Sequence, residues 1–411
     1  MRIVRDRIDR AELPAARGEQ VREIIEAVRA DGDAAVVRLT ERFDGAQLTP
    51  GELRVDGGEL QAALEALAPQ VVGALRTSIA NVRAVAEVQF HGPVAVELAE
   101  GQQIEVVEVP VRRVGVYVPG GRAPYPSTVV MCAVTARAAG VDQVAVCAPP
   151  GPDGGVHPVI LAACALCEVD EVYRMGGAQA IAALAYGTES IEPVDVIAGP
   201  GNAWVQEAKR QVAWTRVGID GIAGPSELAV VATAGADAEL IALDLVAQAE
   251  HGEESPLWLI SPDPGLLDSI GRAAERLARE RPSAADAELS LVGAASAREA
   301  LELAERIAPE HLELVGAEAE ALAGEVRCAG CLFVGRGGAT AFGDYVAGSN
   351  HVLPTGGAAR FQSAVSAATF RRRMARVSLP GEAPARLAPA GAALARAEGF
   401  PVHAESMERR A

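Results

Sequence analysis

Short apolar runs alternate with amphipathic stretches along most of the chain from Val111 onward. Runs such as RVGVYV, VAVCA, EVYRM, VDVIAG, LAVVA, WLIS, LSLVG, LELVG and CLFVG have the length and composition of buried strands. Stretches with helical periodicity separate them, for example residues 203–212 and 237–250. Because no hairpin signal joins consecutive strands, we predict an α/β fold with parallel, doubly wound sheets.

The same pattern divides the chain into four parts. Residues 1–110 are mostly helical, with Val21, Ile24, Ile25 and Val28 at helical spacing. Two successive strand and helix series, over 111–227 and 228–365, predict two similar Rossmann-like domains. Residues 366–411 are rich in Arg and Ala and contain several prolines, which indicates a helix, a linker and a small terminal element.

Composition narrows the possible partners. The net charge of −18 over 411 residues argues against nucleic acid or an anionic membrane, and it suits a small cationic substrate or simply solubility. The N-terminus has no apolar core of a signal peptide, and no apolar run reaches the ~18 residues of a membrane span. We therefore expect a cytoplasmic protein.

The six cysteines include two C-x-x-C pairs, Cys164/Cys167 and Cys328/Cys331. Their separation does not fit a compact zinc knuckle. One pair lies in an apolar helical stretch and the other leads into an apolar strand, so we expect buried, reduced thiols.

Three glycine-rich turns follow predicted strands: Pro119-Gly120-Gly121, Gly176-Gly177-Ala178-Gln179 and Gly199-Pro200-Gly201-Asn202. Ligands of open parallel sheets bind beyond the carboxyl ends of strands, where glycine lets backbone amides approach an anionic group. A dinucleotide would suit these turns, although no complete G-x-G-x-x-G motif is present. Tight turns between strand and helix also need glycine for conformational reasons alone.

Four of the six histidines lie in short polar clusters. Gln248 and His251, three apart on a predicted helix, share one face and both can bind a metal. Asp344 lies in a glycine-rich loop and is either a third ligand or a turn former. His351 in the same loop is as well explained by loop packing, and His403 alone has the character of a tail residue.

Glu310 and His311 form a further cluster between Pro309 and the strand LELVG. Adjacent residues face one pocket only from an irregular turn. A histidine beside a glutamate suits one base for an alcohol proton and one for water. A solvated charged turn is the alternative.

Seven ordered motifs together resemble the histidinol dehydrogenase family, from about Val21 to His403. They are YVPGGRAPYPSTVVM, GGAQAIAALAYGT, GPGNAWVQEAKRQV, AGPSELAVVA, AQAEHG, APEHLEL and GDYVAGSNHVLPT. The resemblance implies NAD-dependent, four-electron oxidation of L-histidinol to L-histidine through L-histidinal, in the last steps of histidine biosynthesis. It also implies one Zn²⁺ per subunit and a homodimer with shared active sites, in which 366–411 is a dimerisation tail.

The resemblance also implies site residues. The zinc ligands would be Gln248, His251 and Asp344, with His403 supplied by the other subunit. Glu310 and His311 would be the catalytic bases, and Tyr117, Gln179 and Asn202 would contact NAD. Ser226, Glu398 and His311 would bind substrate together with the zinc ligands. In this assignment 111–227 binds NAD, whereas 228–365 carries the zinc and catalytic residues.

Two other functions are compatible with parts of the sequence. A zinc-dependent hydrolase would also use His, Asp and Glu, but it predicts a compact H-E-x-x-H helix that the chain lacks, and it leaves the glycine turns unused. A metal-binding scaffold built on the C-x-x-C pairs leaves Glu310 and His311 unexplained. The dehydrogenase accounts for all of these features.

Overall fold

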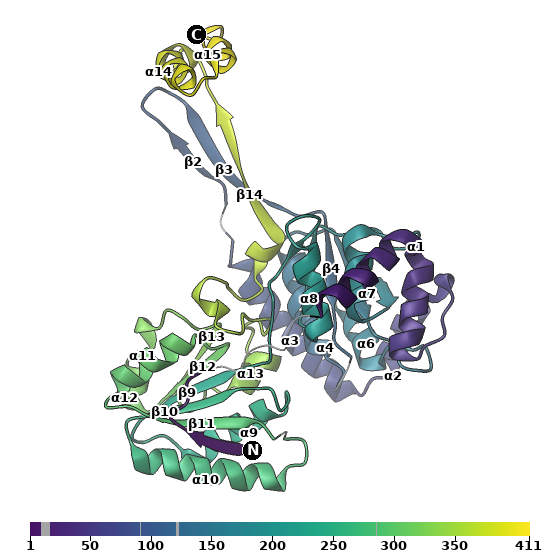
Figure 1. The fold of residues 1–411 in the computed structure, drawn as a ribbon, viewed down its shortest axis with the longest axis vertical. Helices are drawn as coiled ribbons and strands as arrows, with labels where there is room; N and C mark the ends of the chain where they lie inside the picture. The colour runs from purple at the N-terminus through teal and green to yellow at the C-terminus, as the bar shows by residue number, and fades with distance from the viewer. Residues whose placement is uncertain (10–16, 91, 121–122, 285) are drawn as a thin grey trace.

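Two parallel β-sheets form the body of the molecule (Figure 1). The computed structural model describes residues 1–9, 17–90, 92–120, 123–284 and 286–411. The first sheet has the order β6-β5-β4-β7-β8 and comprises β4 (Arg113–Tyr117), β5 (Gln143–Ala148), β6 (Glu171–Arg174), β7 (Val196–Ala198) and β8 (Gly218–Ile219). The second has the order β1-β11-β10-β9-β12-β13 and comprises β1 (Arg2–Arg5), β9 (Leu228–Ala232), β10 (Leu257–Ser261), β11 (Glu288–Gly293), β12 (His311–Val315) and β13 (Cys331–Val334).

Helices cover both faces of each sheet. Central strands such as β4 and β9 are therefore buried along their whole length. On the first sheet, one face carries α1 (Gly18–Asp44), α7 (Gly177–Tyr186) and α8 (Ala203–Val212). The other face carries α2 (Gly57–Ala66), α3 (Pro69–Glu87), α4 (Pro126–Val129), α5 (Thr135–Ala138) and α6 (Pro158–Leu166). A short π-helix (Val130–Val134) joins α4 to α5. On the second sheet, one face carries α9 (Ala238–Ala249) and α10 (Pro264–Glu280). The other face carries α11 (Ala297–Ile307) and α12 (Ala317–Glu320). None of the helices in the described part of the chain combines the length and apolar character that crossing a membrane requires.

The two sheets share one topology. In each series the strands lie in the order third, second, first, fourth, fifth, and β1 is added at the edge of the second sheet. All strand pairs within these two sheets are parallel. The predicted α/β fold with two similar Rossmann-like units is therefore confirmed, whereas the boundaries 1–110, 111–227, 228–365 and 366–411 remain predictions.

Residues 1–110 are mostly helical, as predicted, but the structure adds strands that the sequence analysis did not predict. β1 pairs with β11, and β2 (Val94–Glu97) and β3 (Gln103–Pro110) follow α3. After residue 365 the chain forms the unexpected strand β14 (Arg371–Ser378), which pairs antiparallel with β3. The pairing was not evident from the sequence because its two partners are more than 260 residues apart.

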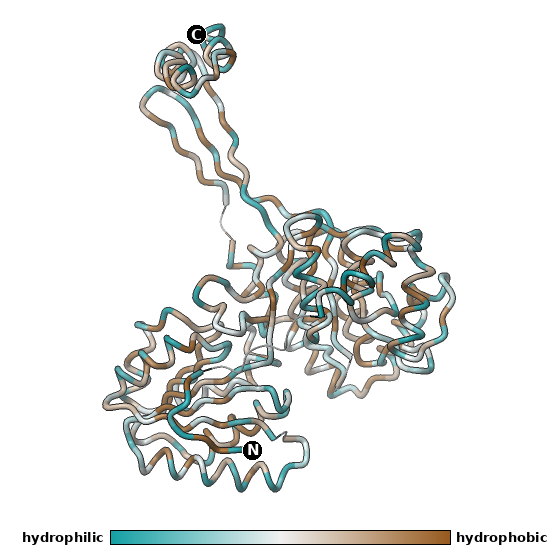
Figure 2. The backbone as a smooth tube through the Cα atoms, in the orientation of Figure 1, coloured by the Kyte–Doolittle hydropathy of each residue, from teal (hydrophilic) through white to brown (hydrophobic). Residues whose placement is uncertain are grey.

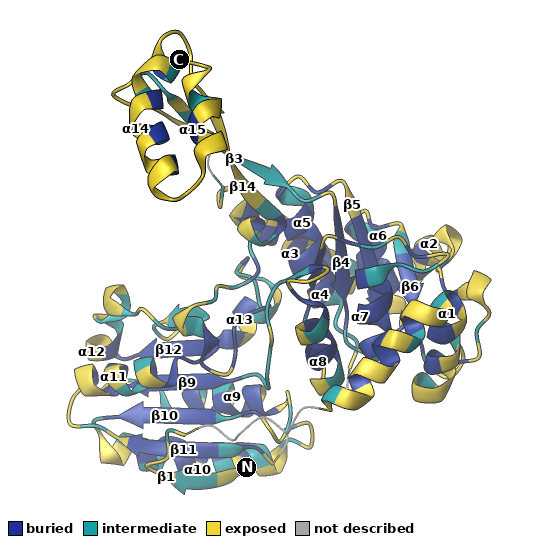
Figure 3. Cartoon of the chain, turned by 45° about the horizontal axis from the view of Figure 1, so that its top comes forward, coloured by how far each residue is buried: buried dark blue, intermediate teal, exposed yellow. Residues whose placement is uncertain are grey.

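These strands form an arm that projects from the body (Figure 1). Its three-stranded sheet has the order β14-β3-β2, and the tip carries α14 (Ala383–Ala397) and α15 (Pro401–Glu408). The two tip helices are mostly exposed (Figure 3), and apolar segments occur along the arm (Figure 2). Apolar surface of the arm therefore remains uncovered within a single chain, at residues such as Val94, Val377 and Val402.

The cysteines are all free thiols. Cys164 and Cys167 are buried in and beside α6, as predicted. The prediction was wrong for Cys328 and Cys331, which are partly exposed because β13 is an edge strand.

A buried ion pair fixes the turn after β7. A Cβ on Gly199, which has φ +118°, would lie 2.1 Å from the carbonyl oxygen of Tyr117. The Gly199 N–H donates to Oδ2 of Asp220 (2.8 Å), and Lys209 Nζ donates to the Gly199 carbonyl (3.0 Å) and pairs with Asp220. Because Lys209 and Asp220 are 1% and 5% exposed, each depends on the other for its charge balance.

We expect Lys209→Met to destabilise the protein by about 3–5 kcal/mol, because it leaves the Asp220 carboxylate buried without its partner. Urea unfolding followed by tryptophan fluorescence measures the change. The control is Arg276→Met, which breaks the exposed pair with Glu239 and should have little effect. Equal stability of the two variants would contradict this account of the turn.

Candidate functional site

A pocket with a volume of about 870 Å³ lies between the two sheets. The first sheet reaches it with the carboxyl ends of β4 and β7, at Tyr117 and the turn from Pro200 to Asn202. The second sheet reaches the pocket with the amino ends of its strands, since Ser226 precedes β9 and His311 begins β12. The expectation of a site beyond carboxyl ends therefore holds for the first sheet only.

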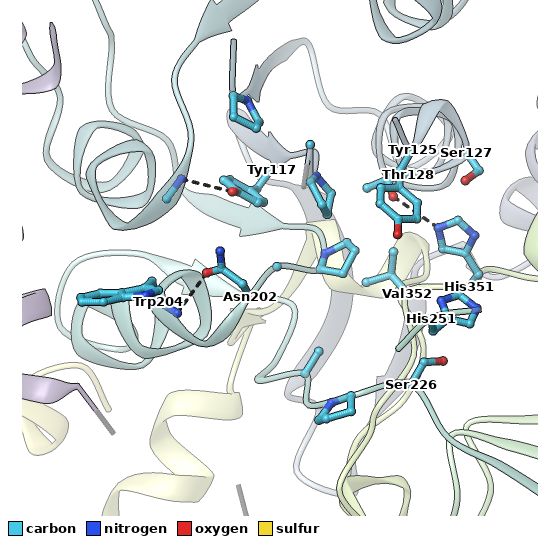
Figure 4. A pocket seen from close by; sticks show the side chains of 18 of the residues that line it. Tyr117, Tyr125, Ser127, Thr128, Asn202, Trp204, Ser226, His251, His351 and Val352 are labelled. Carbon is cyan, nitrogen blue, oxygen red and sulfur yellow. Dashed lines mark hydrogen bonds between the residues drawn. The ribbon is translucent and has the colours of Figure 1, made fainter. Parts of the chain in front are cut away.

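The glycine turns form one side of the pocket (Figure 4). The Gly177 N–H donates to the Tyr117 hydroxyl (3.1 Å), and Asn202 Oδ1 caps α8 by accepting from the N–H groups of Trp204 (3.0 Å) and Val205 (3.2 Å). Gln179 is 1% exposed, and neither polar atom of its amide has a hydrogen-bond partner. A buried amide without partners is costly, which indicates that a ligand satisfies it.

These turns fit a dinucleotide. At Gly120 and Gly176, packing alone already requires glycine, because an added Cβ would come within 2.5 or 2.6 Å of the Pro149 ring. The N-terminus of α7 opens directly at Gly177, and such helix ends favour phosphate. Of the first predicted turn, Gly121 lies outside the described residues.

Glu310 and His311 lie on the other side of the pocket. Ala308, at the end of α11, has the left-handed value φ 50°, and Pro309 follows it. This irregular turn, as the sequence predicted, places both side chains in the wall of the pocket.

A hydrogen-bond network through Ser226 and Glu227 orients this pair. The His311 Nδ1 lies 2.9 Å from the Glu227 carbonyl, which can only accept, so Nδ1 carries the proton and Nε2 has a free lone pair. Oε2 of Glu310 accepts from the Ser226 hydroxyl (2.5 Å) and the Glu227 N–H (2.8 Å). Gln248 Nε2 in turn donates to Ser226 Oγ (2.6 Å), which leaves the Gln248 carbonyl oxygen available.

Burial shifts the proton affinities of both groups. Desolvation raises the pKa of Glu310 to about 8, although its bonds to Ser226 and Glu227 oppose the shift. Desolvation lowers the pKa of His311, although the negative charge of Asp344 acts to raise it. His311 is therefore neutral near pH 7 and able to accept a proton at Nε2.

The predicted metal ligands lie around the same end of the pocket. Gln248 is in the last turn of α9, but His251 follows the helix rather than lying on it, with its N–H donating to the Gln248 carbonyl (3.2 Å). Asp344 lies in the short helix α13 (Thr340–Tyr345), where we predicted a loop, and its Oδ1 is 3.8 Å from His311 Nε2. Desolvation raises the pKa of Asp344 to about 6 and lowers that of His251, which is open to the pocket but surrounded by protein.

The donor atoms at this end of the pocket are chemically suited to zinc. His251 offers nitrogen, and Gln248 and Asp344 offer oxygen, all of which zinc accepts. Within the described residues, no three His, Cys, Asp or Glu side chains are grouped closely enough to hold a metal ion. Glu398 and His403, the other two predicted site residues, are on the arm, outside the residues that line the pocket.

Glu227 was missed by the sequence analysis, and His351 was considered there only as a loop residue. His351 lines the pocket, its Nδ1 bonds the Asp344 carbonyl (2.9 Å), and Nε2 lies 3.5 Å from Thr128 Oγ1 (Figure 4). Glu227 accepts the Glu310 N–H at Oε2 (3.3 Å) and the Gly356 N–H at Oε1 (3.1 Å). A charged residue directly before the apolar strand LAVVA was the available signal for Glu227.

Comparison with known proteins gives one consistent result. The family model described as histidinol dehydrogenase matches residues 9–411. Histidinol dehydrogenases of a Synechococcus strain and of Rhizobium meliloti are each 44% identical, over 96% and 95% of this chain and 92% and 91% of theirs. The crystal structure of histidinol dehydrogenase from Elizabethkingia anophelis is similar with a TM-score of 0.94 at 31% identity, covering 100% of this chain and 98% of that one. The extent of the match and the shared fold establish that the chain belongs to the histidinol dehydrogenase family.

Proposed function

We propose that the pocket between the two sheets oxidises L-histidinol to L-histidine through L-histidinal, with NAD⁺ as the hydride acceptor. The observation that carries this proposal is that one cavity joins the glycine turns to Glu310 and His311. A zinc hydrolase, the alternative from the sequence, would leave the buried, unpartnered amide of Gln179 without a role.

His311 is the base for the hydroxyl proton of the substrate. Its Nδ1–H is bound to the Glu227 carbonyl, so Nε2 is the atom that accepts the proton while a hydride leaves the same carbon for NAD⁺. Its lowered pKa keeps it unprotonated before each transfer. The nicotinamide of bound NAD⁺ supplies the hydride acceptor, and Tyr117, Gln179 and Asn202 hold the dinucleotide.

Glu310 serves the second oxidation. The aldehyde needs water before it can give up another hydride, and Glu310, in its ionised form, takes a proton from that water. Ser226 and the Glu227 N–H fix the position of the carboxyl group. His311 then accepts the hydroxyl proton of the hydrate, which explains why one site contains two different bases.

Gln248, His251 and Asp344 would hold the zinc ion, with His403 of a second copy of the chain as the fourth ligand. The zinc ion would supply an anchor for the imidazole and amine of histidinol. Glu398 enters the site beside His403 and offers a carboxylate to the cationic substrate. Each active site is then shared between two subunits of a homodimer.

The arm supports this exchange. Its strand register places six aliphatic residues on one face of the three-stranded sheet: Val94, Val96, Ile104, Val106, Ala375 and Val377. Val94, Val96 and Val377 are 64%, 49% and 63% exposed. At the tip, Leu394, Phe400 and Val402 are exposed by 67%, 52% and 73%. Apolar surface of this extent around Glu398 and His403 is typical of an interface between subunits.

We expect His311→Asn to reduce the hydride transfer rate by roughly 10²- to 10⁴-fold, because the substrate hydroxyl loses its base. Zinc content and dimerisation should be unchanged, since asparagine can still donate to the Glu227 carbonyl. Single-turnover NADH formation measures the rate, and His157→Asn, at the cap of α6, is the matched control. Wild-type turnover in His311→Asn would remove this residue from the base role.

Glu310→Gln should affect the second oxidation more than the first. Glutamine keeps the size of the side chain and can accept the Ser226 and Glu227 bonds, but it cannot take a proton from water. We expect oxidation of added L-histidinal to fall by roughly 10²-fold or more, with a smaller loss for L-histidinol in a single turnover. Equal losses in both assays would indicate a structural role only.

Subunit complementation tests the shared site. His403→Asn and His251→Asn proteins should each be inactive. Unfolded and refolded together, half of the dimers combine both chains with one intact site each, so we expect about one quarter of wild-type activity. His251→Asn mixed with Asp344→Asn should remain inactive, because both changes fall in the same half of the site. Failure of the first mixture to regain activity would contradict the exchange of the arm.

A further inference from the structure

The side of the pocket opposite the histidines contains a carboxylate that the mechanism above does not use. Asp44 lines this pocket with Phe43, Pro150 and Trp204. Its charge contributes to the raised pKa of Tyr117, so it lies near that phenol. In Figure 4, Tyr117, Asn202 and Trp204 occupy one side of the pocket, whereas Ser226, His251 and His351 occupy the other.

The fold gives Asp44 little support. One of its carboxylate oxygens is buried without a hydrogen-bond partner, and desolvation raises its pKa to about 6. Asp44 is also the last residue of α1, where the helix dipole disfavours negative charge. A carboxylate in so unfavourable a place is better explained by a ligand than by stability.

The first sheet lacks an acid where Rossmann folds commonly have one. In those folds an Asp or Glu near the end of the second strand binds the ribose hydroxyls of NAD. Here the second strand is β5, and it is followed by Pro149-Pro150-Gly151-Pro152. Asp44, from α1, reaches the same pocket as these residues.

The direction of the dinucleotide follows from the chemistry. Hydride transfer requires the nicotinamide near His311, so the adenosine must extend toward the side with Tyr117 and Trp204. Apart from Asp44, the carboxylates among the described lining residues are Glu310 and Asp344, which lie at the histidine end. Those lining residues include no lysine or arginine that could bind an added phosphate.

We propose that Asp44 determines cofactor specificity by accepting hydrogen bonds from the adenosine ribose of NAD and by repelling the 2′-phosphate of NADP. The proposal rests on the placement of NAD in this pocket. An ionised carboxylate both binds vicinal hydroxyls and opposes a phosphate dianion, so one residue produces both effects.

The test measures nucleotide binding directly. Zinc-loaded full-length protein is titrated with NAD⁺ and with NADP⁺ by calorimetry, without L-histidinol. We expect Asp44→Asn to weaken NAD⁺ and strengthen NADP⁺ binding, narrowing the ratio of their Kd values by roughly ten- to hundredfold. Asp153→Asn is the matched control, because this exposed carboxylate lies in the adjacent loop but does not line the pocket. It should leave the ratio unchanged.

A further variant separates this proposal from the placement of NAD. Gln179→Ala should weaken the binding of NAD⁺ and of NADP⁺ to the same extent, since the proposed contact of the Gln179 amide does not involve the 2′ position of the ribose. If Gln179→Ala weakens binding while Asp44→Asn leaves the ratio as in wild type, the role of Asp44 is wrong and the pocket assignment stands. If neither variant changes the affinity for NAD⁺, the pocket assignment itself is wrong.

Discussion

The site depends on the way Glu227 holds Glu310 and His311. Its carbonyl binds both the backbone N–H and the Nδ1 of His311, and its own N–H binds the Glu310 carboxyl group. Its carboxylate accepts from the Glu310 and Gly356 N–H groups. Glu227 directly precedes β9, and Leu228 of β9 pairs with His311 of β12. This backbone pairing therefore fixes the positions of Glu310 and His311 relative to Glu227. A shift of this pairing would disturb the tautomer of His311 and the position of Glu310 together.

The opposite orientation of the two sheets explains how one pocket serves two chemical tasks. The first sheet presents carboxyl ends and helix N-termini, which suit an anionic dinucleotide. The second sheet presents the amino ends of its strands, where hydrogen bonds from the Glu227 backbone orient the side chains of Glu310 and His311. The ion pair of Lys209 with Asp220 ties Gly199, in the turn after β7, to the start of the segment that leads to Ser226 and β9.

Local pattern was enough to predict the α/β fold, the glycine turns and the irregular turn before Glu310. It failed where the structure depends on distant partners. Nothing in Arg371-Arg372-Arg373 predicts a strand, because that strand exists only through its pairing with β3. His351 shares its segment with Asp344, but its position in the pocket depends on a bond to the Asp344 carbonyl and on Thr128 in α4. Spacing indicated Gln248 and His251 as possible metal ligands, whereas the predicted roles of His403 and Glu398 came from the family resemblance alone.

The central claim is that one site carries out both oxidations without releasing the aldehyde. The most direct measurement is the amount of NADH formed when zinc-loaded protein consumes a limiting quantity of L-histidinol in excess NAD⁺. The account predicts two equivalents of NADH and one of L-histidine, with no free L-histidinal. A single equivalent with accumulation of L-histidinal, or no NADH at all, would contradict it.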